Sequence, residues 1–148
     1  MLMLLFSVGE ERYAIQSHHV VEIVPKVHLK EIPHVPPYIM GMLNFRGEPV
    51  PIVDICKLLK DRPTSSQYHS RIIVLKITTK EKGDCLFGIL AEKVTETANY
   101  NPEDFFSGGV ELKDTPYLQG VLTEGKEEIR YIAIKKIFEM VKDSLFSL

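Results

Sequence analysis

Apolar and polar residues alternate with a period of two along most of this chain of 148 residues. Leu4, Phe6 and Val8 begin the pattern and lead into the pair Gly9-Glu10. A period of two places successive side chains on opposite faces of a strand. The chain is therefore predicted to be mainly β, with strands at five places: residues 4–8, 12–15, 41–55, both sides of 80–84, and 117–134.

Three short helices are expected beside these strands. Ser17 is suited to cap a helix that carries Val20 to Val24, and Pro25 would end that helix. Asp54 is suited to cap a final helical turn after the third strand region. The segment "KKIFEMV", residues 135–141, has the apolar spacing of a short closing helix.

The segment 41–55 is predicted to form a hairpin whose tip is Asn44 to Glu48. Its second strand contains Pro49 and Pro51, which have no backbone N–H to donate to a neighbouring strand. This strand is therefore expected at the edge of its sheet or at a bulge.

The second half of the chain repeats the first. Tyr38, Gly41 and Leu43 align without a gap on Tyr117, Gly120 and Leu122. The repeat predicts one domain with two related β subdomains, each covering an apolar edge of the other. The shared glycines are expected to mark a bulge or a close backbone approach. We place the first repeat at about residues 1–60, a polar linker at about 60–70, and the second repeat at about 71–148.

The two repeats differ at the hairpin tip. Asn44-Phe45-Arg46-Gly47 in the first repeat aligns with Thr123-Glu124-Gly125-Lys126 in the second. A tip that served only as a turn would need no aromatic residue and would keep glycine in the same register. The tip of the first repeat is therefore predicted to have a specialised role.

Charge and composition exclude several classes of function. A formal net charge of −2 provides no basic footprint for nucleic acid. The apolar residues 1–6 are too few to span a bilayer, so no direct membrane insertion is expected and the protein is placed in the cytoplasm. Cys56 and Cys85 are expected to be buried thiols. His18 and His19 are adjacent and expected to point apart. No cofactor, metal ligands, catalytic residues or other sign of an enzyme are identified.

The run from Gly41 to Asp54, "GMLNFRGEPVPIVD", resembles the hallmark motif of the CheW-like coupling proteins of bacterial chemotaxis. An upstream "YAI…VVEI" element and matches almost to the C-terminus extend the resemblance over nearly the whole chain. It implies two intertwined, SH3-like, five-stranded β-barrels without catalytic activity. It also implies an adaptor that is recruited to membrane receptor arrays. Its partners would be the cytoplasmic tip of transmembrane chemoreceptors, the regulatory domain of the histidine kinase CheA, and CheW-like neighbours.

The resemblance places Arg46 and Glu22 on the receptor side. Glu22 is a candidate to pair with Arg46, although a structural role remains open because Glu96 occupies the equivalent place in the second repeat. Asn44 is expected either to stabilise the bend or to contact the receptor, and alternation places Phe45 in the core. The receptor-binding residues expected are Val20, Glu22, Val27, Asn44, Arg46 and Gly47.

Two departures concern the second repeat. The usual "GLxVD" segment of the family is "GILAE" here, with Glu92, and Ala133 stands where an acid is usual. These changes leave open which partner the second subdomain contacts. Two alternatives for the whole protein also remain open: a coupling protein of a receptor-kinase pathway for pili or development, and a ligand-binding β-barrel module.

Overall fold

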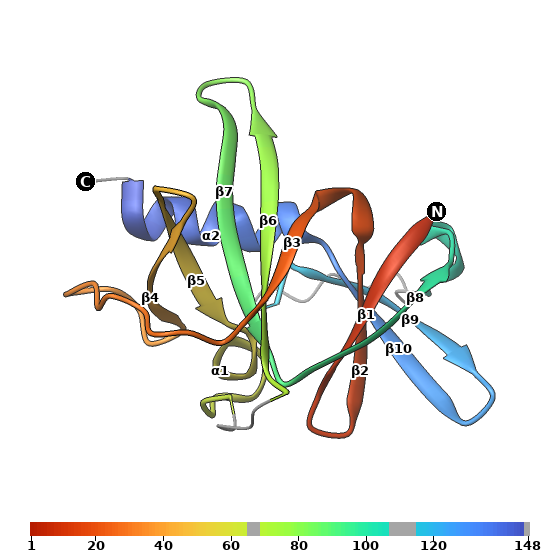
Figure 1. The fold of residues 1–148 in the computed structure, drawn as a ribbon. Helices are drawn as coiled ribbons and strands as arrows, with labels where there is room; N and C mark the ends of the chain where they lie inside the picture. Colours follow the sequence, from red (N-terminus) through yellow and green to blue (C-terminus); the bar gives the residue numbers. More distant parts are fainter. Residues whose placement is uncertain (65–68, 107–114, 147–148) are drawn as a thin grey trace.

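The computed structural model describes residues 1–64, 69–106 and 115–146. Their ten strands form two five-stranded sheets (Figure 1). The first sheet contains, in spatial order, β8 (Lys93–Asn99), β1 (Leu2–Val8), β2 (Glu11–Gln16), β10 (Glu127–Ile132) and β9 (Leu118–Glu124). The second contains β3 (Val20–Pro25), β6 (Arg71–Thr79), β7 (Gly83–Ala91), β5 (Glu48–Asp54) and β4 (Ile39–Phe45).

The two sheets are intertwined. The β1–β2 hairpin joins β8, β9 and β10 from the other end of the chain, and the β6–β7 hairpin joins β3, β4 and β5. Each hairpin docks through one antiparallel pairing, β1 with β8 and β6 with β3, and one parallel pairing, β2 with β10 and β7 with β5. The mainly β fold with two five-stranded subdomains is therefore confirmed. The division into repeats stays a prediction, and residues 65–68 of the expected linker lie outside the described residues.

Three apolar clusters hold this arrangement together. A cluster inside the second sheet includes Leu43, Phe45 and Ile52, and one inside the first includes Met3 and Leu5. The largest cluster lies between the sheets and takes residues from both. Burial of apolar area at about 25 cal/mol per Å² therefore stabilises the contact between the subdomains as well as each interior. The buried residues of the central cluster are Leu4, Phe6, Val8, Tyr13, Ile15, Val53, Ile55, Cys56, Ile73, Leu75, Ile77, Phe87, Ile89, Ala91, Tyr117, Ile132, Ile134, Ile137, Phe138 and Val141.

The aligned glycines confirm the prediction of a close backbone approach. Gly41 and Gly120 both have φ of +153°. A Cβ atom on Gly41 would lie 2.5 Å from the carbonyl oxygen of Lys30, and one on Gly120 would lie 3.0 Å from the backbone of Phe105. Irregular pairing accompanies each of them, in β4 at Gly41 and in β10 opposite the β9 strand of Gly120. Glycine is required because any side chain would collide with backbone.

The predicted helix from Val20 to Val24 is wrong. These residues form β3, which pairs antiparallel with β6, and only Ser17–His19 form a 3-10 turn before it. β-Branched Val and Ile residues occupy four of the five positions, and such side chains favour a strand over a helix. The turn is preceded by Gln16 as its N-cap residue, without a side-chain capping bond.

The hairpin of residues 41–55 is confirmed, but its second strand is not at the sheet edge. β5 lies between β4 and β7. It pairs with β7 only from Ile52 to Asp54, so Pro49 and Pro51 lie in the part of β5 that has no partner on that side. The prolines are tolerated there because no ladder hydrogen bond is required of them in that direction.

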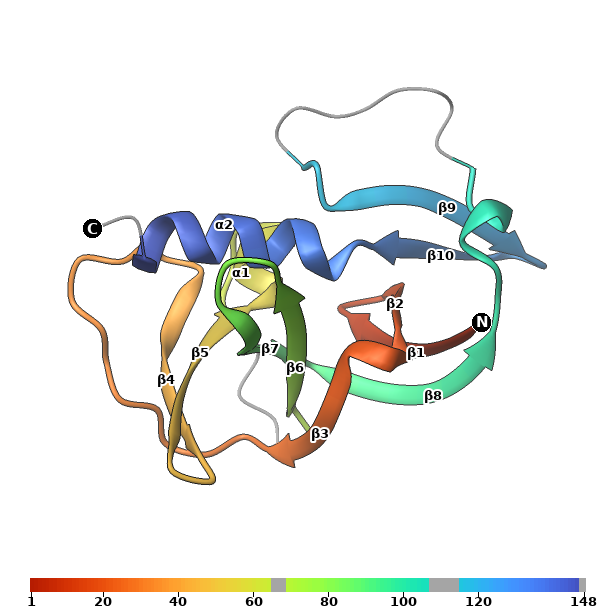
Figure 2. The same cartoon turned by 90° about the horizontal axis from the view of Figure 1, so that it is seen from above.

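Both predicted helices that follow strands are present. The Asp54 carboxylate accepts hydrogen bonds from the N–H groups of Cys56 and Lys57, and so caps α1 (Ile55–Lys60). α2 (Ile134–Phe146) is longer than the expected segment 135–141. It leaves β10 of one sheet and extends to the side of β4 and β5 of the other (Figure 2). No helix in the described part of the chain is long and apolar enough to cross a membrane.

The turn between the two sheets contains a buried histidine. His19 is 9% exposed, and its ring centroid lies 4.0 Å from that of His18. The expectation that these two side chains point apart is therefore wrong, because a tight 3-10 turn brings successive side chains closer than a strand does. Burial lowers the pKa of His19, with a further contribution from neighbouring His18 and Lys135, while a backbone hydrogen bond with Lys76 opposes the shift.

Acidification is expected to destabilise the fold through His19. Because its pKa is lowered on folding, its contribution to stability is complete above pH of about 6.5 and is lost as pH falls through the folded-state pKa. The free energy of unfolding, measured by urea denaturation between pH 7 and 5, should fall with a slope of at most about 1.4 kcal/mol per pH unit from this residue. His19→Gln should remove that part of the slope, whereas His28→Gln, at an exposed position, should keep it.

Candidate interaction surface

The tip of the β4–β5 hairpin is a two-residue turn made of Arg46 and Gly47. Phe45 pairs with Glu48, and the two residues between them have φ of 51° and 85°. Positive φ at both positions is typical of the tight hairpin turn that prefers Asn-Gly. Arginine at the first of these positions costs about 1–2 kcal/mol because its Cβ crowds the following carbonyl oxygen.

The turn between β9 and β10 shows that arginine is not needed for the bend. Glu124 pairs with Glu127 there, which leaves Gly125 and Lys126 as the two turn residues. Gly125 aligns with Arg46 and has φ of 64°, a conformation that glycine adopts at no steric cost. The second repeat thus places the ordinary residue where the first places a strained arginine. The bend by itself therefore does not account for an arginine at this position.

The Arg46 side chain is held in place but remains accessible. Its Nη2 donates to Oε1 of Glu22 over 2.9 Å, and its guanidinium carbon lies 4.8 Å from the centroid of the Phe45 ring. The Arg46 side chain is 69% exposed and that of Glu22 is 41% exposed. The expected pairing of Glu22 with Arg46 is present. An exposed pair of this kind contributes at most about 1 kcal/mol to folding, so its main effect is to orient the guanidinium.

The other residues of the tip serve the turn. Oδ1 of Asn44 accepts a hydrogen bond from the N–H of Gly47 over 3.0 Å. Of the two roles left open for Asn44, the structure shows stabilisation of the bend. Phe45 is buried, as alternation predicted. A Cβ atom on Gly47 would have no neighbour within 4 Å, so this glycine lies in open space.

β3 provides exposed apolar side chains beside this tip. It is an edge strand, and its pairing with β6 is irregular between Val20 and Glu22. Val21 and Ile23 flank Glu22 and are 39% and 40% exposed, and Val27 beyond the strand is 48% exposed. Val20, by contrast, packs against the central cluster. We call Val21, Glu22, Ile23, Val27 and Arg46 the β3-tip surface.

Val21 and Ile23 were missed because the segment was predicted to be a helix. Read as a strand, its alternation separates exposed Val21 and Ile23 from half-buried Val20, Glu22 and Val24. The number of β-branched residues is the signal that would have revealed them.

The equivalent surface of the first sheet has a different character. β8 takes the place of β3, but its exposed residues are polar, among them Lys93, Glu96 and Thr97. Glu96, which aligns with Glu22, accepts from Arg12 Nη2 over 2.7 Å, and Arg12 Nη1 also donates to Glu127 over 2.6 Å. Hydrogen bonds to Glu127 and Glu96 raise the pKa of Arg12. The acid is kept in both repeats, but only in the first are its two neighbours along the strand exposed apolar residues.

The β3-tip surface has the chemistry of a protein interface. It combines a planar guanidinium, oriented by a carboxylate, with exposed aliphatic side chains on an edge strand. These groups make the surface suited to holding a partner. In the described ranges 1–64, 69–106 and 115–146, no three His, Cys, Asp or Glu side chains gather as a metal site requires.

Comparisons with known proteins agree with this geometry. The chemotaxis protein CheW of Treponema pallidum is 27% identical over 139 residues, which cover 90% of this chain and 79% of that protein. CheW of Helicobacter pylori is 24% identical over 137 residues, covering 93% of this chain and 79% of the relative. The crystal structure of the scaffolding protein TtCheW from Thermoanaerobacter tengcongensis has the same fold, with a TM-score of 0.74 at 24% identity over 90% of this chain and 84% of that one. A family model described as a CheW-like domain matches residues 2–142, and the chain therefore belongs to the CheW-like domain family.

Proposed function

We propose that this protein is a non-enzymatic cytoplasmic adaptor that couples transmembrane chemoreceptors to the histidine kinase CheA in chemotaxis signalling. Membership of the CheW-like family supports a scaffolding role, and the relatives named above are chemotaxis proteins. One observation carries the receptor part of the proposal. Arg46 occupies a left-handed position that its sister turn gives to Gly125, and so a partner contact accounts for the strain.

The receptor tip docks on the β3-tip surface in this proposal. Val21, Ile23 and Val27 pack against apolar side chains of the receptor, while the guanidinium of Arg46 binds a carboxylate or backbone carbonyls. Glu22 limits the orientations of the guanidinium before the partner arrives, which lowers the entropic cost of binding. Val20 contributes by supporting β3 from the core side, and Asn44 and Gly47 by holding the turn.

The regulatory domain of CheA and CheW-like neighbours bind elsewhere, at the ends of the two sheets. The adaptor then holds receptor and kinase in a fixed geometry, so that a shift in the receptor biases the kinase between its states. Many copies in one array make modest individual contacts sufficient.

Charge reversal at the tip tests the proposal. Arg46→Glu should weaken binding of a receptor-tip fragment by about tenfold or more, because the new carboxylate repels the acceptor groups and Glu22 together. Binding of the CheA regulatory domain should change by less than about twofold. Both dissociation constants are measured by titration calorimetry on the same preparations, and an unchanged melting temperature shows that the variant is folded.

Lys126→Glu is the matched control. It makes the same reversal of charge at the sister turn, on the other sheet, and should leave receptor affinity unchanged. Equal losses for receptor and kinase in Arg46→Glu, or equal losses of receptor affinity in the two variants, would contradict the assignment of the β3-tip surface to the receptor.

A further inference from the structure

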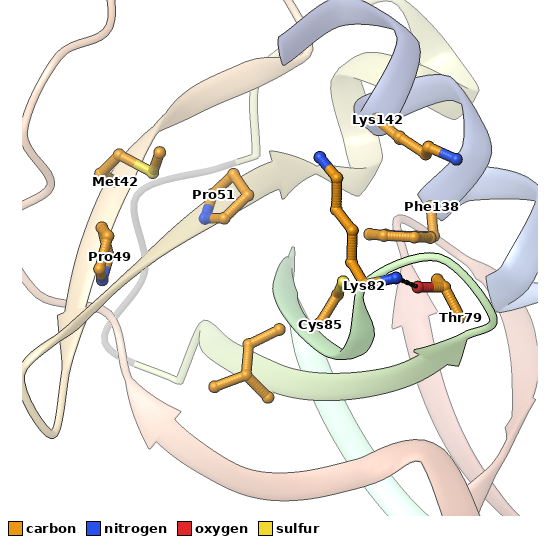
Figure 3. Close-up of a pocket in the computed structure, with 9 residues that line it drawn as sticks. Met42, Pro49, Pro51, Thr79, Lys82, Cys85, Phe138 and Lys142 are labelled. Atoms are coloured by element: carbon orange, nitrogen blue, oxygen red, sulfur yellow. Dashed lines mark hydrogen bonds between the residues drawn. The ribbon is translucent and has the colours of Figure 1, made fainter. Parts of the chain in front are cut away.

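An apolar pocket lies on the second sheet, away from the β3-tip surface. It has a volume of about 250 Å³ and opens between the β4–β5 hairpin, the end of the β6–β7 hairpin and α2 (Figure 3). Met42 and Pro51 contribute apolar walls from the two paired strands of the hairpin, and Phe138 contributes one from α2. The volume equals that of about eight water molecules at about 30 Å³ each, which suits a small organic molecule rather than a folded partner. The complete lining is Met42, Pro49, Pro51, Thr79, Lys82, Cys85, Leu86, Phe138 and Lys142.

The charged residues that line this pocket are two lysines, so the charge of its lining is positive. Lys82 comes from the β6–β7 turn and Lys142 from α2, and Figure 3 shows their amines on the same side of the Phe138 ring. The Thr79 hydroxyl is engaged with the turn, because it accepts from the Lys82 N–H over 3.0 Å and donates to the Gly83 carbonyl over 3.2 Å. Nζ of Lys142 lies 3.4 Å from a carboxylate oxygen of Glu81, whose side chain is 76% exposed.

The contact with Glu81 shows that the ammonium of Lys142 can hold a carboxylate. The distance of 3.4 Å is longer than a strong charge-assisted hydrogen bond, and the exposed Glu81 has freedom to move aside. A ligand carboxylate that replaced Glu81 at Lys142 would lie in a lining whose other charged residue, Lys82, is also cationic, and it would bury its hydrocarbon part against the apolar walls. A cationic or uncharged ligand would gain only the apolar part of this interaction.

We propose that this pocket binds a small amphipathic carboxylate, with its hydrocarbon part against Met42, Pro51 and Phe138 and its carboxylate at Lys82 and Lys142. The pocket shares no residue with the β3-tip surface, although Met42, Pro49 and Pro51 belong to the hairpin whose tip carries Arg46. Since α2 and the β4–β5 hairpin both line it, an occupied pocket would tie these two elements together.

Cys85 provides a direct readout because its thiol lines the pocket. Contrary to the expectation of two buried thiols, Cys85 is only half-buried, whereas Cys56 is fully buried. Burial also raises the pKa of Cys56 to about 11, so Cys56 serves as the unreactive internal control. The rate of Cys85 alkylation by iodoacetamide is followed by mass spectrometry of the intact protein with increasing octanoate.

We expect octanoate to slow alkylation of Cys85 by tenfold or more at saturation, and octylammonium, with the same hydrocarbon chain, to give much weaker protection. In the double variant Lys82→Gln/Lys142→Gln, half-protection should require about fivefold more octanoate, because two exposed ion pairs are lost. Glu81→Gln, which removes the competing carboxylate, should leave protection intact or improve it.

Three results would overturn the proposal. The first is no protection by octanoate in the folded protein. The second is equal protection by octanoate and octylammonium, which would show an apolar hollow without preference for charge. The third is protection by an acidic peptide but not by octanoate, which would assign the surface to a protein partner. A circular dichroism spectrum unchanged by octanoate separates protection from unfolding.

Discussion

Gly41→Ala is expected to destabilise the fold by about 3 kcal/mol or more, or to prevent folding. The new Cβ would lie 2.5 Å from the carbonyl oxygen of Lys30, and φ of +153° is itself unfavourable for alanine. Lys30 has little freedom to withdraw, because its N–H and carbonyl both bond to Met42, over 2.9 Å and 2.8 Å. The free energy of unfolding from urea denaturation measures the effect.

Gly47→Ala is the matched control for that experiment. Gly47 also has positive φ, but its added Cβ would meet no atom within 4 Å. Its cost should therefore be only the conformational part, about 1–2 kcal/mol. A similar loss of stability in both variants would show that the approach of Lys30 is unimportant and that the conformation alone matters.

Asp54→Ala should lower the free energy of unfolding by about 3–5 kcal/mol. The buried Asp54 carboxylate accepts from the N–H groups of Cys56, Lys57 and Thr64, over 3.1, 3.3 and 2.9 Å, and also from the Thr64 hydroxyl. Alanine would leave several of these donors buried without a partner. Urea denaturation again gives the measurement.

Two variants separate capping from charge. Asp54→Asn keeps an acceptor for the cap of α1 and should cost less than Asp54→Ala. Asp61→Asn removes the charge of an exposed acid that forms an i,i+4 pair with Lys57 at 3.0 Å but keeps a residue suited to the left-handed φ of 55°, and it should cost less than about 0.5 kcal/mol. If Asp54→Ala were no more harmful than Asp61→Asn, the buried network would not be an important source of stability.

The aligned position in the second repeat is Ala133, which has no carboxylate. The N–H of Asp54 donates to the carbonyl of Tyr38 over 2.7 Å, and the N–H of Ala133 donates to the carbonyl of Tyr117 over 2.8 Å. The backbone bond is thus common to both repeats, while the carboxylate is not. In the first repeat this carboxylate ties Thr64, in the segment before β6, to the start of α1.

Glu92 has a comparable role where the chain passes from β7 to β8. It accepts from the N–H of Gly9 over 2.8 Å and from Nη2 of Arg62 over 3.0 Å, so it connects the β1–β2 turn with the segment after α1. The acid of the unusual "GILAE" segment therefore joins parts of both subdomains.

Local features of the sequence predicted much of this fold. Alternation identified both long hairpins, because strand faces repeat every two residues wherever one face is buried. The aligned glycines predicted close backbone contacts, since only glycine tolerates such an approach. The difference between the two hairpin tips identified Arg46 as unusual. Arg46 and Gly125 occupy aligned turn positions with positive φ, and only glycine adopts this conformation at no steric cost.

The predictions that failed depended on partners distant in the sequence. Val20–Pro25 is a strand because β6, about fifty residues later, offers it a partner, and a capping residue with a following apolar run does not reveal that partner. Likewise, β5 became an interior strand only because β7 docks beside Ile52 to Asp54 and leaves the prolines unpaired.

The sequence by itself determined most of the strands, the positions where backbones meet and the family, because these follow from local periodicity, glycine sterics and a long spaced motif. Only the tertiary structure decided which hairpin joins which sheet, how Glu22 orients Arg46, and how β4, β5, β7 and α2 enclose an apolar pocket beneath two lysines. The physical reason is that strand pairing and burial bring together residues that are far apart along the chain, and local sequence patterns do not indicate which distant residues will be in contact.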